Sequence, residues 1–327
     1  MDGTSQQPAH TMVKPRHQST MTGDPLFKGL VLATGIGVLL VLGAIITVMA
    51  VGGIPAFKAF GPGFLFSAAW NPVSQHFGAA APVFGTLASS AIGLIIAIPL
   101  SFGTAFWLTA LAPPALSSVI GMAVQLLAAV PSIIFGMWGF FVLVPPMAHY
   151  VQPTARHLFG HVPGLSALVS GAPFGTGLLT AGLILAIMIM PSITAVMRDV
   201  FVSMPTVLRE SAYGLGATRW EVMRQVVLPW SRHGVVGGIV LGMGRAMGET
   251  MAVTFVIGDS NHIGWSLFAP SNTIASLIAL EFPESPAGSL KLASLMALGA
   301  ILMAISFITL WCSRVLLVRS ESQAGKR

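Results

Sequence analysis

The sequence contains very few charged residues. Asp, Glu, Lys and Arg together make up 8% of the 327 residues, whereas about 25% is typical of soluble domains. None of the four occurs from residue 59 to residue 155, and Arg156 is the only one from there to residue 197. Hydrophobic residues make up 54% of the chain. Water cannot be the solvent of such a surface, so the composition predicts an integral membrane protein.

Signatures of catalysis are absent as well. The sequence has no phosphate-binding loop ending in Gly-Lys-Ser or Gly-Lys-Thr, and its one Gly-Lys pair is Gly325-Lys326 near the end. We therefore expect that this chain does not hydrolyse ATP. No nucleophile elbow and no pair of carboxylates lies in an apolar span, so we expect no catalytic residue.

Metal and nucleic-acid sites are also not expected. Cys312 is the single cysteine, which excludes an intrachain disulfide and favours a packing role. His157 and His161 are four residues apart without a third ligand nearby. The net charge of +6 is spread around apolar spans. It forms no basic patch of the kind that binds nucleic acid.

Six apolar segments are long enough to cross a bilayer, for which a helix needs about 20 residues. We expect membrane helices at 29–51, 84–110, 119–144, 174–197, 235–257 and 291–317. Pro99, Pro131 and Pro191 fall inside these segments, where each removes a backbone hydrogen bond and can kink the helix. The expected fold class is therefore an all-α integral membrane bundle of six transmembrane helices.

Lysine and arginine gather in three parts of the chain. The N-terminal tail 1–28, the segment 198–232 and the C-terminal end, including the tail 318–327, hold most of them. Cytoplasmic loops carry this excess, so we expect both termini and 198–232 inside, around a transmembrane domain at 29–317. The first span is too long for a secretory signal and is expected to stay uncleaved. The outer connections are then 52–83, 145–173 and 258–290.

The segment 198–232 is too regular for a simple connection. Pro205 precedes one short helical pattern, and Thr218 with Glu221 three residues later forms a capping box for a second. Pro229 is expected to end that second helix.

Between the two patterns, Gly214 and Gly216 predict a turn. A helix pair of this kind presents an apolar ridge to a partner's groove. The alternative is a surface loop that packs back on its own bundle. The ridge would consist of Val207, Tyr213, Leu215 and Trp220.

The fifth expected span contains two charged residues, Arg245 and Glu249. An arginine at this depth costs about 2.5 to 3.5 kcal/mol on insertion scales, so it should face a partner or a wet cavity. Four residues apart on one helix, the two side chains would share a face. Small residues that let another helix approach closely precede them at similar spacing: Gly234, Gly238 and Gly242.

Two interpretations of this pair remain open. The pair could brace two helices, or Arg245 could meet a passing anion while Glu249 holds it when the anion is absent. A guanidinium presents planar, bidentate donors to an oxyanion and stays charged at any relevant pH.

The segment 198–232 resembles a family motif. Glu210-Ser211-Ala212, Gly216 and Val226-Val227-Leu228-Pro229 are similar to the EAA motif of ABC importer permeases, with Ser211 in place of the usual alanine and Val226 in place of isoleucine. The resemblance implies that this segment docks into an ATPase. The coupling residues would be Glu210, Ser211, Ala212, Gly216, Leu228 and Pro229.

Three further runs, 130–139, 197–200 and 244–253, resemble the phosphate-specific permease family of the PstC type, with similar order and length over about 29–317. The resemblance implies a type I ABC importer permease (MetI-like) bundle in a bacterial plasma membrane. It places Arg245 and Glu249 on the phosphate path.

The resemblance also implies the partners. They are a second homologous permease of the PstA type, an ATPase dimer of the PstB type that binds ATP and Mg, and a periplasmic or lipid-anchored phosphate-binding protein of the PstS type. This chain would hold no cofactor. Alternatives are a permease for sulfate or molybdate, or an anion channel or ion-driven carrier, which would leave the motif at 198–232 unexplained.

Overall fold

The computed structural model describes residues 23–324, with side chains from 25 to 315. Residues 1–22 of the expected tail 1–28, and residues 325–327 of the tail 318–327, lie outside this range. The described tail residues 23–28 already belong to the first helix, and the last helix continues through residues 318–324. The chain divides into two compact units, Met1–Thr47 and Val48–Arg327.

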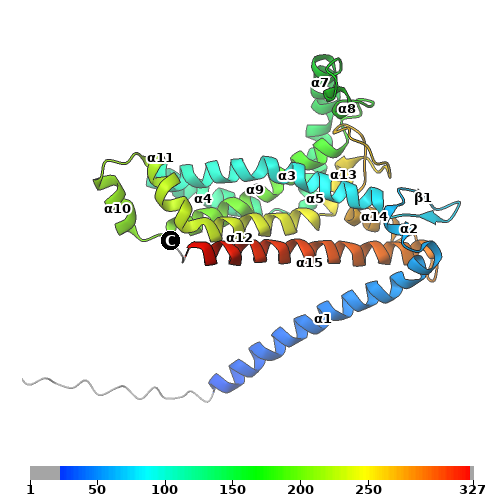
Figure 1. Ribbon diagram of the computed structural model, residues 1–327, viewed down its shortest axis with the longest axis horizontal. Coiled ribbons are helices and arrows are strands. Elements are labelled where there is room, and N and C mark those ends of the chain that lie inside the picture. Colours follow the sequence, from blue (N-terminus) through cyan, green and yellow to red (C-terminus); the bar gives the residue numbers. More distant parts are fainter. Residues whose placement is uncertain (1–22, 325–327) are drawn as a thin grey trace, which may run out of the picture. The chain divides into compact units, whose positions relative to one another are not determined.

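The described chain is mostly helical (Figure 1). Its longer helices are α1 (Gly23–Phe60), α3 (Ala80–Phe106), α4 (Pro114–Ala128), α9 (Leu178–Val202), α12 (Leu228–Met247) and α15 (Leu290–Ala324). Shorter helices are α2 (Gly63–Phe66), α5 (Ser132–Trp138), α6 (Val144–Pro146), α7 (Gln152–Phe159), α8 (Leu165–Leu168), α10 (Thr206–Gly214), α11 (Arg219–Val222), α13 (Met251–Ile257) and α14 (Ile274–Glu281).

Four π-helical segments extend or join these helices: η1 (Trp107–Leu111), η2 (Gly139–Leu143), η3 (Met147–Val151) and η4 (Met223–Val227). Two short strands, β1 (Trp70–Asn71) and β2 (His76–Phe77), pair antiparallel with Trp70 opposite Phe77.

Six helices of the described chain are long and apolar enough to cross a membrane: Pro25–Phe60, Ala80–Leu111, Ser132–Phe159, Leu178–Val202, Arg219–Met247 and Leu290–Val315. The predicted number of spans is confirmed. The predicted third span, 119–144, is wrong. Residues 129–131 are not helical and divide this segment into α4 and α5. Pro131 lies at this break instead of inside a helix, since a proline disfavours helical geometry in the residue before it. Pro99 and Pro191 do lie inside α3 and α9.

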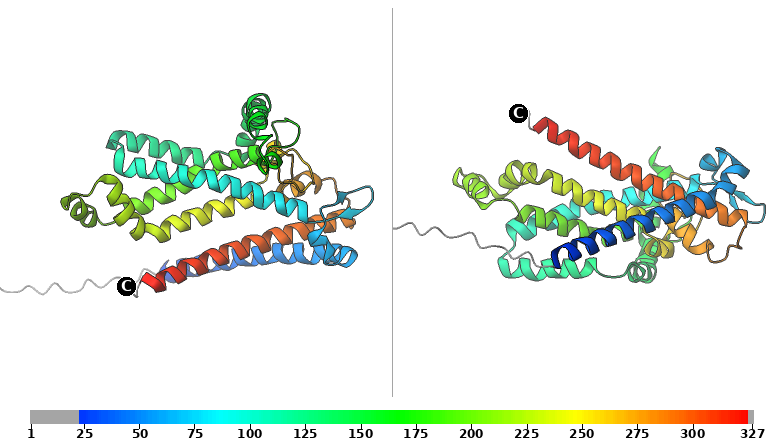
Figure 2. Two further views of the ribbon diagram at one scale, coloured as in Figure 1. Left: turned by 45° about the horizontal axis from the view of Figure 1, so that its top comes forward. Right: turned by 90° about the horizontal axis from the view of Figure 1, so that it is seen from below.

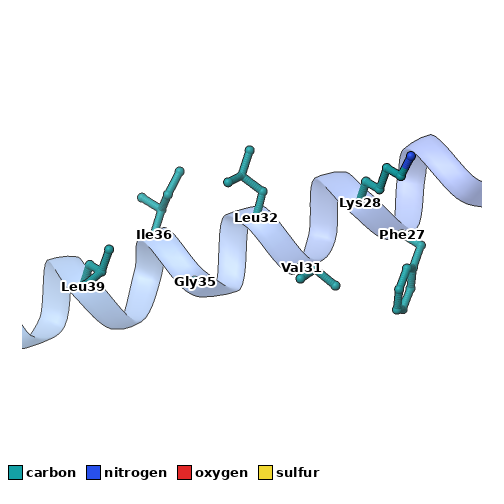
Figure 3. Close-up of a pocket in the computed structure, with 7 residues that line it drawn as sticks. All are labelled: Phe27, Lys28, Val31, Leu32, Gly35, Ile36 and Leu39. Atoms are coloured by element: carbon teal, nitrogen blue, oxygen red, sulfur yellow. The ribbon is translucent and has the colours of Figure 1, made fainter. Parts of the chain in front are cut away.

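The described part of the first unit, 23–47, belongs to α1. Its large apolar side chains are exposed within the unit, and Figure 3 shows them on more than one side, with Leu32 and Ile36 opposite Phe27 and Val31. A helix that is apolar all round suits a lipid environment.

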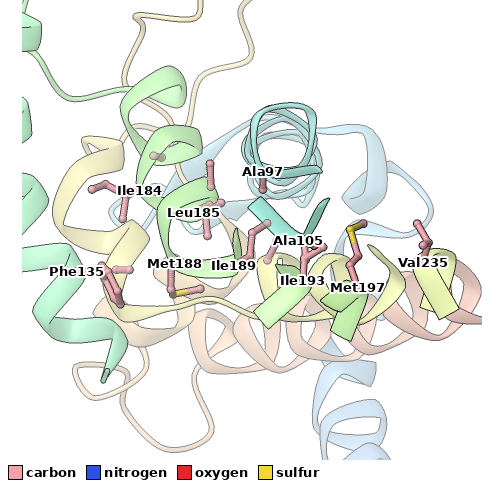
Figure 4. Packing of buried hydrophobic residues seen from close by; sticks show 14 of the residues in the cluster. Ala97, Ala105, Phe135, Ile184, Leu185, Met188, Ile189, Ile193, Met197 and Val235 are labelled. Carbon is pink, nitrogen blue, oxygen red and sulfur yellow. The ribbon is translucent and has the colours of Figure 1, made fainter. Parts of the chain in front are cut away.

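In the second unit, α9 is the central helix. Of its most apolar 18-residue window 61% is buried, compared with 33% or less in the other five spans. It packs against α3, α4 and α12, which run beside it in Figures 1 and 2. The core in Figure 4 is built mainly from its side chains: Ile184, Leu185, Met188, Ile189, Ile193 and Met197. Helices α14 and α15 form a second cluster with the end of α1 and the β1–β2 hairpin.

Candidate functional site

Arg245 lies in the last turn of α12, at the end of a seam of glycines. A Cβ atom built on Gly234 would lie 2.5 Å from Cγ1 of Val200, and one on Gly242 would lie 2.5 Å from Cδ1 of Ile193. A Cβ on Gly238 would lie 3.1 Å from Cγ1 of Val196, a looser approach than at the other two glycines. The glycines therefore let α12 lie directly against α9, as predicted.

The guanidinium of Arg245 continues this seam. Its Nη1 donates to Oγ of Ser192, one residue before Ile193 on α9, at 2.8 Å. Both side chains are half-buried. Arg245 thus faces the bundle and not lipid, which a charged group at this depth requires.

The helix that carries Arg245 ends before Glu249. Helix α12 stops at Met247, and α13 begins at Met251 after a break at residues 248–250. The prediction of one continuous helix over 235–257 is therefore wrong. Gly248 favours the break, because glycine is a poor helix former.

The break separates the two charged side chains. Glu249 Oε1 accepts a hydrogen bond from the backbone N–H of Ala252 at 3.1 Å, which satisfies a donor in the first turn of α13. Within residues 25–315, Arg245 and Glu249 form no ion pair. The bracing pair suggested by the spacing of four is not formed in this structure. The assignment of both residues to a substrate path stays a prediction.

Arg245 can therefore bind an anion without first giving up a carboxylate. Its bond to Ser192 occupies one of the five N–H donors of a guanidinium. The acceptor is a neutral hydroxyl, which leaves the positive charge unbalanced by this contact. A cation fixed on one side and partly accessible on the other is suited to brief contact with an oxyanion.

The structure also brings together two of the sequence runs that carried the resemblance. Gly136 of the 130–139 run packs against α13, which contains the end of the 244–253 run. A Cβ on Gly136 would lie 2.9 Å from Cα of Ala252 and 2.8 Å from Cδ2 of Phe255. Helix α13 follows the break that contains Glu249. The close approach of Gly136 therefore fixes the position of the helix next to Glu249.

The segment 198–232 contains the two predicted helices, α10 and α11. The capping box is confirmed: Glu221 Oε2 accepts from the Thr218 backbone N–H at 2.7 Å, and Thr218 Oγ1 accepts from the Glu221 N–H at 3.3 Å. Between the helices, Gly216 has φ +85°, a left-handed conformation that costs other residues about 1–2 kcal/mol.

Pro229 does not end the second helix. It lies in the first turn of α12, and α11, η4 and α12 form one helix, Arg219–Met247. A proline is tolerated there because a π-helical segment precedes it and rearranges the local hydrogen bonds.

The residues predicted to couple to an ATPase divide between surface and interior, and their coupling role stays a prediction. Glu210, Ser211, Gly216 and Pro229 are exposed, whereas Ala212 and Leu228 are half-buried against the core. Val207 and Leu215 are 67% and 90% exposed. Trp220 instead packs edge-to-face on Phe106 with ring centroids 5.6 Å apart. Val207 of α10 and Leu215 directly after α10 are thus exposed as predicted, whereas Trp220 also contacts the bundle. The docking of this ridge on a partner stays a prediction.

A polar network at the other end of the bundle was not predicted. Glu281 accepts from Nε1 of Trp70 at 2.9 Å and pairs with Nζ of Lys291 at 3.0 Å. Nearby, Asp259 accepts from Nδ2 of Asn272 at 2.7 Å. Partial burial and the negative charge of Glu281 raise the pKa of Asp259, while the bond from Asn272 opposes this shift. Sequence spacing gave no signal, because the partners come from distant segments.

Ser192 was also missed. It is one serine in an apolar span, 53 residues before Arg245, and no local pattern links the two. Within the described residues no group of three or more His, Cys, Asp or Glu side chains could hold a metal ion.

The fold and these contacts define a multi-pass helical membrane protein. It has a positively charged arginine, Arg245, inside its bundle and a helical segment exposed at one end. A family model described as binding-protein-dependent transport system inner membrane component matches residues 97–320, and the chain belongs to that family.

Two curated relatives are named phosphate transport system permease protein PstC. The one from Pasteurella multocida (strain Pm70) is 54% identical over 89% of this chain and 90% of its own length. The one from Mesorhizobium japonicum (strain LMG 29417 / CECT 9101 / MAFF 303099) is 50% identical over 92% of each chain. The resemblance to PstC-type permeases is therefore confirmed.

Solved structures share the fold. An inward-facing MetNI methionine ABC transporter matches with a TM-score of 0.55 at 15% identity, over 77% of this chain and 99% of that one. A bacterial alginate ABC transporter in complex with an alginate pentasaccharide-bound periplasmic protein matches with a TM-score of 0.53 at 16% identity, over 89% and 93%. The predicted six-helix importer permease bundle is confirmed.

Proposed function

We propose that this chain is the permease subunit of an ATP-driven importer of inorganic phosphate. The names of the relatives and their coverage of about nine-tenths of the chain support the substrate. The observation that carries the proposal is Arg245, a half-buried cation in the bundle whose described partner is the neutral hydroxyl of Ser192. The subunit is not an enzyme, because the ATPase of such importers is a separate subunit.

In this proposal Arg245 stabilises phosphate as it passes. The guanidinium offers paired donors to the anion, and Ser192 holds its orientation. Glu249 lies in the break between the two helices, two residues before the start of α13. Its negative charge limits how tightly an anion is retained, so that phosphate is released onward.

The exposed segment around α10 couples this path to ATP. Family membership implies a transporter complex that includes an ATPase and a binding protein. We propose that an ATPase dimer binds Val207, Glu210 and the turn at Gly216, and that ATP and Mg reside in that dimer. A second similar permease would complete the path, and an external phosphate-binding protein would dock at the opposite end. ATP-driven closure would then move α10 and switch the opening of the bundle.

Uptake by whole cells tests the substrate. Bacteria without their own phosphate permease, supplied with this chain and its partner subunits, should accumulate radiolabelled phosphate, and excess sulfate or molybdate should not compete. Competition by either anion at the phosphate concentration used would favour the alternative oxyanion. Anion flux through the purified chain alone, in liposomes without ATP, would favour a channel.

We propose that both termini and the segment 198–232 are cytoplasmic, as the distribution of lysine and arginine indicates. Cys312 is the single cysteine and can be replaced by serine, so that new cysteines report accessibility. In intact cells an impermeant maleimide should label cysteine at Ser285 but not at Ser203. The opposite pattern would invert the topology.

A further inference from the structure

A cavity of about 180 Å³ lies beside the segment 198–232, between α10, α11, η4 and the end of η1. Arg209 and Tyr213 line it from α10, and Arg219 lines it from α11. Thr109 forms the opposite wall, and the remaining lining is apolar apart from the Ala110 backbone region. The cavity therefore lies between the helix pair and the end of η1, beside the contacts that join them.

The charge around this cavity is one-sided. Two guanidinium groups line it, and no Asp or Glu does. Within residues 25–315 neither arginine forms an ion pair. Arg209 donates from Nη2 to the Phe201 carbonyl, and Arg219 donates from Nη1 to the Ala110 carbonyl at 3.3 Å. The described contacts are thus to neutral carbonyls, which leave both charges unbalanced.

One nitrogen of the Arg209 guanidinium has no acceptor in the described structure. This nitrogen is Nε, which is buried. Two unbalanced cations held around one cavity repel each other. An anion between them would remove this repulsion and supply acceptors for the guanidinium donors.

We propose that this cavity is a binding site for a phosphate group, distinct from the transport path. A tetrahedral oxyanion matches the donors of two guanidinium groups and the Tyr213 hydroxyl. The volume of 180 Å³ is several times the ~30 Å³ share of a water molecule. The phosphate group is either inorganic phosphate or the headgroup of an anionic lipid, which offer the same chemistry.

The site is well separated from Arg245. Val227 lines the cavity, and Arg245 lies about 18 residues further along the same helix, or roughly 27 Å at 1.5 Å per residue. A bound phosphate group would join α10 to η1 and so restrain the segment that we assign to ATPase coupling. This consequence, and the cytoplasmic position of the site, rest on the proposed function; binding itself does not.

Hydrogen–deuterium exchange of the full-length chain in nanodiscs tests the proposal locally. In nanodiscs of neutral phosphatidylcholine, adding inorganic phosphate should slow exchange in peptides from residues 206–223. In a second arm without free phosphate, replacing part of the lipid by phosphatidylglycerol should slow it if the headgroup is the ligand. In the same samples, exchange in peptides from residues 245–257 measures whether phosphate binds at the proposed transport path.

Two variants and a control complete the test. Arg219→Gln removes one exposed cation with a single long backbone contact, and Tyr213→Phe removes one hydroxyl; each should reduce the protection at least severalfold. Arg224→Gln makes the same charge change at an exposed position of the same helix outside the cavity, and should leave protection unchanged.

The proposal is supported if exchange in residues 206–223 is slowed in either arm, and if Arg219→Gln abolishes this protection while Arg224→Gln keeps it. The arm that shows protection then identifies the source of the phosphate group. Absence of protection at residues 206–223 in both arms, or equal protection in the two arginine variants, would overturn it. Protection confined to residues 245–257 would overturn this site while leaving the transport path intact. Protection confined to residues 206–223 would support this site without supporting the path.

Discussion

At the scale of single residues, the proposed transport path depends on how Arg245 is held. The hydroxyl of Ser192 fixes the guanidinium from the neighbouring helix, 2.8 Å away. A bond of this kind to a charged group contributes about 1.5–3 kcal/mol. It orients the guanidinium without neutralising it, which a carboxylate at the same place would do.

Ser192→Ala should therefore slow transport. We expect the maximal rate of phosphate uptake to fall about threefold to tenfold, because the guanidinium loses its fixed orientation. The substrate concentration at half-maximal rate should change little, since a separate binding protein captures phosphate. Ser203→Ala is the matched control, because Ser203 directly follows α9 and its hydroxyl donates to the Val200 carbonyl three residues before it, not to another helix. An unchanged rate for Ser192→Ala would contradict the positioning role.

Asp259 should make stability depend on pH at the opposite end of the bundle. Its pKa is raised above the ordinary 3.8, first by burial and then by the charge of Glu281. The folded protein therefore holds the proton more tightly than the unfolded chain, and stability falls as pH rises from the unfolded pKa through the raised folded one.

Melting temperatures between pH 3 and pH 7 measure this effect. Asp259→Asn keeps an oxygen that can accept from Asn272 and should remove the part of the pH dependence due to this carboxyl group. A variant whose melting curve follows the same pH dependence as the parent would show that Asp259 does not cause it.

At the scale of elements, the contact between α12 and α9 needs glycine at particular positions only. A Cβ on Gly234 would meet the branched side chain of Val200 at 2.5 Å, while Gly237 has nothing within 4 Å. Both glycines lie inside a helix, where alanine has a higher helix propensity than glycine by up to about 1 kcal/mol. This advantage is the same at the two positions.

Gly234→Ala should lower the melting temperature, because overpacking typically costs about 1–3 kcal/mol. Gly237→Ala should leave it unchanged or raise it. Thermal unfolding of both variants in the same detergent provides the comparison. Equal melting temperatures would mean that the close contact along this seam does not stabilise the bundle.

The turn between α10 and α11 offers a second pair of glycines. Gly216 has φ +85°, whereas Gly214 ends α10 without a positive φ. Alanine at Gly216 costs about 1–2 kcal/mol in this conformation, a factor of about 5 to 30 in the equilibrium ratio of ordered to disordered turn.

Gly216→Ala should reduce phosphate uptake and binding-protein-stimulated ATPase activity of the assembled complex by up to this factor. Gly214→Ala should retain both activities. Full activity of Gly216→Ala would argue against the turn as the element that couples the two subunits.

At the scale of the whole molecule, local signals predicted the elements well. Span number followed from apolar length, and the Thr218–Glu221 capping box marked the start of α11. Around Pro131 and Gly248 the apolar residues continue although the helix is interrupted. Apolar length predicted one span at each place, and the structure has two helices there. The partner of Arg245 could not be predicted, because Ser192 approaches it only once α9 and α12 are packed.

The most direct test of the central claim is phosphate uptake by proteoliposomes that contain the complete complex with Arg245→Gln. We expect uptake to fall at least about tenfold, the loss of a charge-assisted contact of 1.5 kcal/mol or more, while assembly and ATPase activity persist. Arg245→Lys should retain part of the rate, and the exposed control Lys58→Gln all of it. Normal uptake by Arg245→Gln, or loss of assembly, would contradict a transport role for this arginine.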